Sequence, residues 1–170
     1  MVSKPSVCVG LPNASLGTVF PWLLLLFRPM RTIPEIDYSE AKRVIDLIVG
    51  KALQEQKAVV AAVADSHGEL ICFARMDGAP VSSIRIAMNK AWTAARARKP
   101  TQEIGEKVRH PEKGYDIAYY GDSRFVGWGG GIPVWKNGEV AGAVAVSGLS
   151  STEDVNLANL GAELITHANS

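Results

Sequence analysis

Two pairs of strand-like segments, each joined by a short turn, constrain the fold of this chain most. Residues 58–64 and 69–75 are apolar runs with only four residues between them. Residues 132–136 and 140–146 form a second pair, and Asn137-Gly138 between them is the combination favoured in a two-residue type I′ hairpin. Parallel strands need a crossover of a dozen or more residues, so both pairs must be antiparallel. The sequence therefore predicts an antiparallel sheet.

Helical patterns flank the first pair of strands. Apolar residues at steps of three and four predict one helix from Asp37 to about Gln56 and another from Ile84 to about Arg98. Asp37 is a candidate N-cap. Glu40 lies three residues later, so its side chain can bond back to the cap in a variant of the capping box.

Two further helices follow the same rules. Thr101 is the predicted cap of a short helix ending at Val108, and Ser151 with Asp154 is the predicted cap signature of the last helix. The stretch between His110 and Arg124 is rich in Gly and Tyr and is expected to be irregular and exposed. The predicted fold class is thus α/β (α+β), with about five antiparallel strands and packed helices.

The first 31 residues differ in pattern from the rest. Their apolar run, from Leu16 to Phe27, is shorter than the roughly 20 residues of a membrane-spanning helix, and no small-x-small cleavage pattern follows it. Met30 leads directly into the first helix and is an alternative start. We expect residues 1–31 to be an N-terminal extension, either a mis-assigned start or a signal-like segment, and residues 32–170 to be one domain. The expected location is cytoplasmic, or secreted if the extension is a signal peptide.

Charge and cysteine content exclude several classes of function. The chain has 18 Lys and Arg against 17 Asp and Glu, so its formal charge of +1 gives no electrostatic reason to expect a nucleic acid partner. Cys8 and Cys72 lie far apart, with no CxxC or Cys/His spacing. Neither a disulfide framework nor a structural zinc site is expected.

Five short blocks of the sequence resemble, in order, the signature blocks of the GlcG/HbpS-like haem-binding family. They are 63–68 (VADSHG), 75–78 (RMDG), 90–94 (KAWTA), 130–133 (GGIP) and 142–148 (GAVAVSG). The resemblance implies a profilin-like sandwich that usually forms a symmetric homo-oligomer. Members of the family include haem-binding proteins and the C-terminal domain of some corrinoid adenosyltransferases.

His67 departs from the family pattern. The usual Asp-x-Gly-Gly is Asp65-Ser66-His67-Gly68 here. A turn histidine with one free ring nitrogen can be an axial iron ligand or a general base, because its ordinary pKa lies near 6.5. Histidine is also enriched at positive φ, so His67 can instead be a turn residue only. His110, which precedes Pro111, is a second histidine that can approach a pocket.

Lys90 lies mid-helix beside the apolar stripe and therefore needs an anionic partner. Asp65 or Asp77 can be that partner, or else a ligand carboxylate such as a haem propionate. Arg75 and Thr93 are assigned with Lys90 to the polar rim of the same site.

Glycines and tryptophans complete the candidate site. Gly129, Gly130 and Gly131 let the backbone approach a ligand and offer N–H groups to an anion, although glycine-rich bends also occur without ligands. Three tryptophans can line a tetrapyrrole pocket or serve core and subunit packing: Trp92, Trp128 and Trp135.

Two functions are consistent with these residues. The favoured one is a small oligomeric protein that binds haem or a related tetrapyrrole through His67, as an accessory to a catabolic pathway. The alternative is a cofactor-independent isomerase, lyase or hydrolase acting on a small carboxylate or aromatic metabolite, with Lys90, His67 or Asp65 in acid/base roles. A binder should have an apolar, porphyrin-sized cleft, whereas an enzyme should have a smaller polar pocket where Lys90 meets Asp65 or Asp77. Assembly alone is a third possibility.

Overall fold

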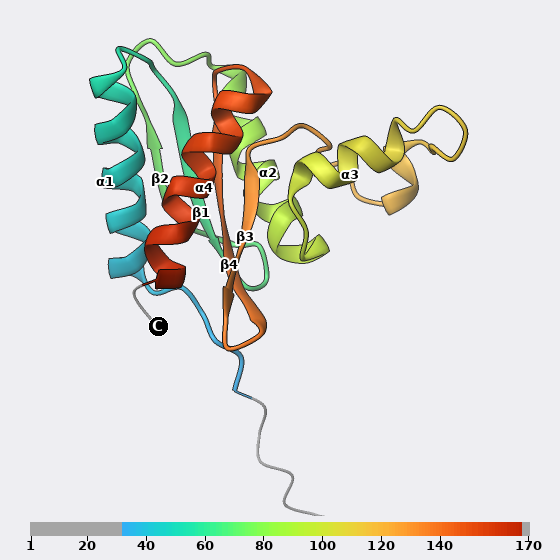
Figure 1. Ribbon diagram of the computed structural model, residues 1–170, viewed down its shortest axis with the longest axis horizontal. Coiled ribbons are helices and arrows are strands. Elements are labelled where there is room, and N and C mark those ends of the chain that lie inside the picture. Colours follow the sequence, from blue (N-terminus) through green and yellow to red (C-terminus); the bar gives the residue numbers. More distant parts are fainter. Residues whose placement is uncertain (1–31, 168–170) are drawn as a thin grey trace, which may run out of the picture. The chain divides into compact units, whose positions relative to one another are not determined.

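A four-stranded antiparallel sheet forms the centre of the structure, a computed structural model that describes residues 32–167 (Figure 1). Its strands are β1 (Val60–Asp65), β2 (Leu70–Arg75), β3 (Gly131–Lys136) and β4 (Glu139–Ser147), in the order β2-β1-β4-β3. Both predicted hairpins are confirmed, and β1 also pairs with β4. About five strands were predicted, and the described residues form four.

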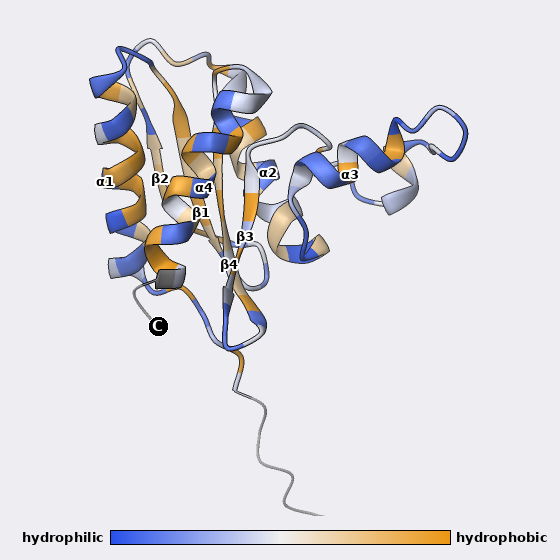
Figure 2. Cartoon of the chain, viewed as in Figure 1, coloured by the Kyte–Doolittle hydropathy of each residue, from blue (hydrophilic) through white to orange (hydrophobic). Residues whose placement is uncertain are grey.

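Helices cover both faces of this sheet. The helices are α1 (Tyr38–Gln54), α2 (Ser82–Ala97), α3 (Thr101–Val108) and α4 (Ser151–His167), with one 3-10 turn, η1 (Ile117–Tyr120). Successive side chains of a strand point to opposite faces. Ala61 and Val63 accordingly join the core beneath α1 and α4, while Ala62 and Ala64 join the core beneath α2. Figure 2 shows the apolar residues gathered in the strands and along the inner side of α1.

Local sequence signals explain two of the element boundaries. Asp37 caps α1 by accepting a bond from Glu40 N, and the Glu40 carboxylate accepts from Asp37 N, so the predicted capping box is confirmed. The bond from Glu40 N lowers the pKa of Asp37. Asn137 and Gly138 both have positive φ, 52° and 77°, as the type I′ turn between β3 and β4 requires.

Both of the other predicted helix caps are wrong. Pro100 occupies the N-cap of α3, while the Thr101 hydroxyl donates to Trp128 O at 2.6 Å and accepts from Gly131 N at 3.0 Å. Ser150 and Glu153 form the reciprocal bonds that start α4, through Ser150 N to Glu153 Oε2 and Glu153 N to Ser150 Oγ. Asp154 is consequently left to bind elsewhere.

The remaining predictions about segments have mixed outcomes. The stretch from His110 to Arg124 is largely irregular and holds only η1. The expectations for residues 1–31 lie outside the described residues. Among the described helices, none is both long enough and apolar enough to cross a membrane.

Two helical glycines provide a test of how closely α1 and α4 must pack. A Cβ at Gly161 would lie 2.9 Å from both Val44 Cγ1 and Ile48 Cδ1, whereas nothing lies within 4 Å of a Cβ at Gly50. Gly161→Val should therefore lower the free energy of unfolding by about 1–3 kcal/mol through overpacking. Gly50→Ala should raise it by about 0.5–1 kcal/mol because alanine restricts the unfolded chain. Urea denaturation measures both, and an equal response at the two positions would contradict this packing.

Candidate functional site

His67 and Arg75, which the sequence analysis assigned to the same binding site, lie far apart in the structure. His67 lies in the β1–β2 turn, but Arg75 ends β2 at the opposite end of the sheet, five residues from Leu70. At about 3.3 Å per strand residue, that is roughly 16 Å. Arg75 donates from Nη2 to Ala79 O at 3.3 Å, which orders the loop before α2. His67 and Arg75 therefore do not form a common site within this chain.

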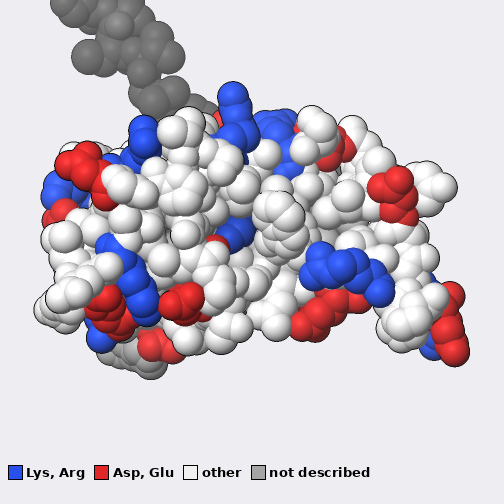
Figure 3. Space-filling view, turned by 90° about the horizontal axis from the view of Figure 1, so that it is seen from above, with Lys and Arg blue, Asp and Glu red and all other residues white. Residues whose placement is uncertain are grey.

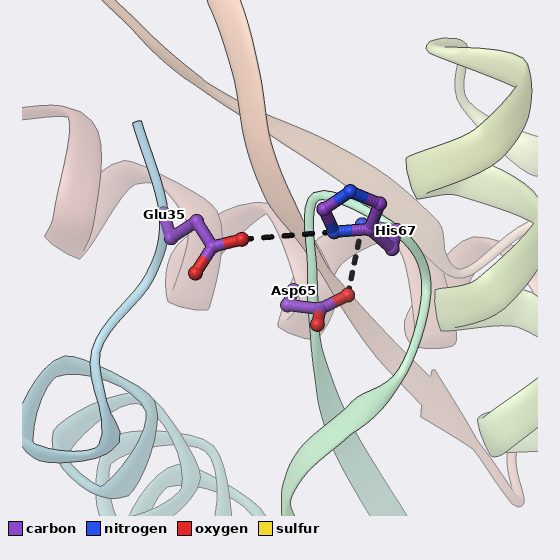
Figure 4. A group of neighbouring side chains, drawn as sticks. All are labelled: Glu35, Asp65 and His67. Atoms are coloured by element: carbon purple, nitrogen blue, oxygen red, sulfur yellow. Dashed lines mark hydrogen bonds and ion pairs between the residues drawn. The ribbon is translucent and has the colours of Figure 1, made fainter. Parts of the chain in front are cut away.

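Three side chains that can bind metal do converge at the His67 end of the sheet (Figure 4). One ligand atom from each of Glu35, Asp65 and His67 lies within 4.8 Å of the others. Glu35 precedes α1, and its Oε1 is 3.6 Å from His67 Nδ1. Asp65 Oδ1 accepts backbone N–H bonds from His67 and Glu69, each at 2.8 Å, so this carboxylate holds the turn in place.

The imidazole of His67 is oriented with one nitrogen toward the protein and one away from it. Nδ1 faces Glu35 Oε1 and Ser66 Oγ, the latter at 3.3 Å. Nε2 has no partner among the described residues, and the side chain is 62% exposed. Gly68 has the positive φ of this turn, 89°, and His67 is absent from the non-glycine residues with positive φ. The interpretation of His67 as a left-handed turn residue is therefore wrong.

Two arginines that the sequence did not point to lie beside this turn. Arg96 donates from Nε to His67 O at 2.8 Å. The guanidinium carbons of Arg96 and Arg124 lie 5.0 and 4.1 Å from the centroid of the Trp92 ring. Arg96 follows Trp92 by four residues on α2, so helical spacing predicts that contact. Arg124 reaches the ring from an irregular loop, and no periodic signal indicates it.

Lys90 is buried in an ion pair whose partner was predicted incorrectly. Its Nζ lies 2.7 Å from Asp154 Oδ2 and 2.9 Å from Val146 O, and the two side chains are only 2% and 4% exposed. The predicted partners, Asp65 and Asp77, are wrong. Burial lowers the pKa of Lys90 and raises the pKa of Asp154, while their hydrogen bond opposes both shifts. The pair joins α2 to α4, which lie on opposite faces of the sheet.

The glycine run before β3 makes room for this pair. A Cβ at Gly130 would lie 2.7 Å from Asp154 Cβ and 2.9 Å from Lys90 Nζ, and one at Gly131 would lie 2.6 Å from Lys90 O. A Cβ at Gly129 would meet Ser151 Oγ at 2.8 Å. The space beside these glycines is filled by the chain's own atoms.

Thr93 and the three candidate tryptophans occupy contrasting environments. The Thr93 hydroxyl is fully buried, donates to Arg124 O and accepts from Val126 N, so it anchors that loop. Trp92 is buried, whereas Trp128 and Trp135 are exposed. Of these three, only Trp92 therefore packs within the core of this chain.

A cavity of about 650 Å³ lies between the end of α2, α3 and the loop after it. Its lining includes Arg96, Ile104, Lys107, His110, Tyr120 and Phe125. The rings of Tyr120 and Phe125 stack at 4.3 Å, and a bond with Tyr115 raises the pKa of Tyr120 to about 12. His110 Nδ1 accepts N–H bonds from Glu112 and Lys113, so the neutral ring carries its proton on Nε2. His110 thus has no free lone pair for a metal.

A smaller cavity of about 360 Å³ lies beside Lys90 and Asp154, where α2 and α4 begin. Its size matches the smaller pocket expected of an enzyme. The partner of Lys90 in this cavity is Asp154, however, and not Asp65 or Asp77.

Comparison of the sequence with known proteins confirms the predicted resemblance. Residues 36–163 match the family model described as haem degrading protein, HbpS-like. A 15.0 kDa protein from the dhaT-dhaS intergenic region of Citrobacter freundii is 39% identical over 126 residues, covering 74% of this chain and 89% of that protein. Protein GlcG of Escherichia coli K12 is 30% identical over 69% of this chain and 85% of its own length. Corrinoid adenosyltransferase PduO of Salmonella typhimurium is 28% identical, and the match spans 72% of this chain but 37% of PduO.

Solved structures share the fold. Klebsiella pneumoniae protein ORFY superposes with a TM-score of 0.76 at 32% identity, over 82% of this chain and 97% of that one. A PduOC:heme complex superposes with a TM-score of 0.71 at 27% identity, over 76% and 94% of the two chains.

The buried ion pair predicts a large effect of removing one partner. Lys90→Met should lower the free energy of unfolding by about 3–5 kcal/mol, because Asp154 would remain buried without a counter-ion. The double variant Lys90→Met/Asp154→Leu should recover most of that loss. Lys42→Met, which breaks the exposed pair with Asp46, should change stability little. Urea denaturation compares them, and equal losses for Lys90→Met and Lys42→Met would contradict the assignment.

Proposed function

The chain belongs to the family of haem-degrading, HbpS-like proteins, and on this basis we propose that it binds haem with Nε2 of His67 as an axial ligand of the iron. The observation that carries the proposal is the orientation of the His67 ring. Nδ1 faces the Glu35 carboxylate at 3.6 Å, while Nε2 is left without a partner among the described residues. Haem bound there supplies an iron centre and an intense Soret absorption.

The residues around His67 fit this role chemically. A histidine that ligates metal usually donates its other ring N–H to a carboxylate or carbonyl, which fixes the tautomer and makes the ligating nitrogen more basic. Glu35 Oε1 lies 3.6 Å from Nδ1, within ion-pair distance, and Ser66 Oγ lies between them at 3.3 Å from each, while Asp65 holds the backbone of the turn. His110 has the opposite arrangement, because its Nδ1 accepts two N–H bonds.

Two cations lie at the same end of the sheet. Arg96 and Arg124 are each about half exposed, with side-chain exposures of 46% and 45%. Arg124 Nη2 also donates to Asp122 Oδ2 at 2.7 Å, so a propionate would compete with that carboxylate. A guanidinium group can bind a carboxylate through two hydrogen bonds. We assign the propionates to these two arginines, in place of Arg75 at the far end of β2 and Lys90 in its buried pair.

The larger cavity adds an apolar surface next to these groups. Arg96 bonds to the His67 carbonyl and also lines the cavity of about 650 Å³, together with Phe125 and Ile104. That volume lies within the range of about 300–1,000 Å³ typical of cofactor sites.

A homo-oligomeric state is part of the proposal. Trp135 lies on β3 and is 44% exposed, and β3 is an edge strand with one side unpaired in the described part of the chain. Exposed tryptophans are enriched in protein interfaces. A cytoplasmic location and an accessory role in a catabolic pathway stay predictions.

Hemin titration tests the iron ligand. The wild-type chain should bind hemin stoichiometrically with a shift of the Soret band. His67→Ala should weaken binding at least about tenfold, because removing only the hydrogen-bond partner of a metal-ligating histidine already costs about that much in comparable sites. Arg75→Ala, at the far end of β2, is the control and should bind like the wild type. Glu35→Gln, which keeps the shape of the side chain but removes its charge, should give an intermediate loss.

Two results would contradict the proposal at different levels. Unchanged hemin affinity in His67→Ala would remove His67 as the ligand while leaving haem binding intact. Failure of the wild-type chain to shift the Soret band would remove haem binding itself.

Sedimentation velocity tests the oligomeric state. The chain should sediment as a dimer or larger species, and Trp135→Ala should shift it toward the monomer, since interface tryptophans are frequent hot spots. A wild-type chain that sediments as a monomer at micromolar concentrations would contradict this part of the proposal.

A further inference from the structure

The cavity beside Lys90 has features of a ligand site that are independent of haem. Its lining residues come from the start of α2, the start of α4 and the end of β4, three segments that lie at the same end of the sheet (Figure 1). Figure 3 looks onto this end and shows a hollow with basic and acidic atoms at its base, surrounded by uncharged residues. Ser83, Lys90, Ser147 and Asp154 are the buried polar residues of its wall.

Two hydroxyl groups of this wall have no partner in the described part of the chain. Ser83 and Ser147 are each only 4% exposed, and neither hydroxyl has a hydrogen-bond partner among residues 32–167. Among the described residues, Trp92 Nε1 is the only fully enclosed side-chain polar atom without a partner, so the two serine hydroxyl oxygens are open to the cavity. A polar group placed in the cavity could therefore hydrogen-bond to both of them.

Lys90 offers a third donor at the same place. An ammonium has three N–H bonds, and those of Lys90 have two acceptors among the described residues, Asp154 Oδ2 and Val146 O. Asp154 uses its other oxygen to accept from Leu149 N, so both of its carboxylate oxygens are engaged within the protein. The base of the cavity therefore offers hydrogen-bond donors to a ligand, and both carboxylate oxygens of Asp154 already accept hydrogen bonds from the protein.

The electrostatic field in the cavity favours a single negative charge. The charges of Lys90 and Asp154 cancel, while the first turns of α2 and α4 contribute Ser82, Ser83 and Ser151 to the wall. The N-terminal N–H groups of a helix have no intrahelical acceptor and carry partial positive charge. A dianion would gain less, because the Asp154 carboxylate lies against the same space.

The rest of the wall is apolar. Pro80, Ile86 and Leu149 line it, and Trp128 closes it with an indole that is 58% exposed. An aromatic or branched body fits such a rim, since aromatic rings stack on tryptophan. The volume of about 360 Å³ lies at the lower end of small-ligand sites, which begin at about 300 Å³.

We propose that this cavity binds a small monocarboxylate with an apolar or aromatic body, whose carboxylate is held by Lys90, Ser83 and Ser147 and whose body packs on Trp128. The site lies on different residues from the His67 group, so its occupancy does not depend on haem binding.

Calorimetric titration of the full chain with benzoate and with phenylacetate tests the proposal. One of these probes should bind saturably with one site per chain, and benzyl alcohol, which lacks the charge, should bind at least about tenfold more weakly, as expected when a charged hydrogen bond is lost. Inorganic phosphate should not compete. The double variant Ser83→Ala/Ser147→Ala should weaken binding at least about tenfold and retain its circular dichroism spectrum, because it removes no buried charge.

A pair of aromatic variants locates the probe. Trp128→Ala should weaken binding severalfold, whereas Tyr119→Ala, an exposed aromatic residue that lies outside the cavity wall, should leave it unchanged. The proposal is overturned if neither probe binds saturably, if the serine variant binds them as tightly as the wild type, or if phosphate binds more tightly than both. Hemin affinity should be the same in all these variants, so failure here is distinguishable from failure of haem binding.

Discussion

The buried ion pair between Lys90 and Asp154 is the interaction on which the arrangement around the sheet depends. Lys90 comes from α2 and Asp154 from α4, and these helices lie on opposite faces. An ammonium in the interior is strongly destabilising unless a counter-ion and further acceptors surround it, so α4 must begin where its carboxylate can reach Lys90. The glycine run at the start of β3 is required because side chains at Gly130 and Gly131 would overlap the pair.

That requirement also creates the cavity at the start of the two helices. Ser150 and Glu153 cap α4, which leaves Asp154 free to accept from Lys90 and from Leu149 N. Ser147 follows the last apolar positions of β4 and faces α2, where an alanine or valine would complete the core. Polar groups thus surround the cavity at one end of the sheet. His67 lies at the other end, in the turn between β1 and β2.

The opposite end of the sheet depends on turn geometry. Asp65 fixes the β1–β2 turn by accepting two backbone bonds, and Gly68 takes the positive φ. His67 is consequently free to direct Nδ1 toward Glu35 and Nε2 outward. The structure thus has two chemically different ends, one with an exposed imidazole flanked by arginines and one with a buried ammonium flanked by hydroxyl groups.

The helices, strands and turns could be predicted from the sequence, because their causes are local. Turn chemistry at Asn137-Gly138, the capping box of α1 and the alternation of apolar residues all act within a few residues, and the hairpins they predict are present. The family resemblance is likewise a property of the sequence, since five short blocks carry it.

The partner of Lys90 could not be predicted in this way, since Asp154 lies 64 positions away and looks in sequence like a helix cap. The same holds for Glu35 and Arg124, which reach His67 and Trp92 from irregular segments. These pairings follow from the packing of the helices on the sheet, because contacts between distant segments leave no periodic signal in the chain.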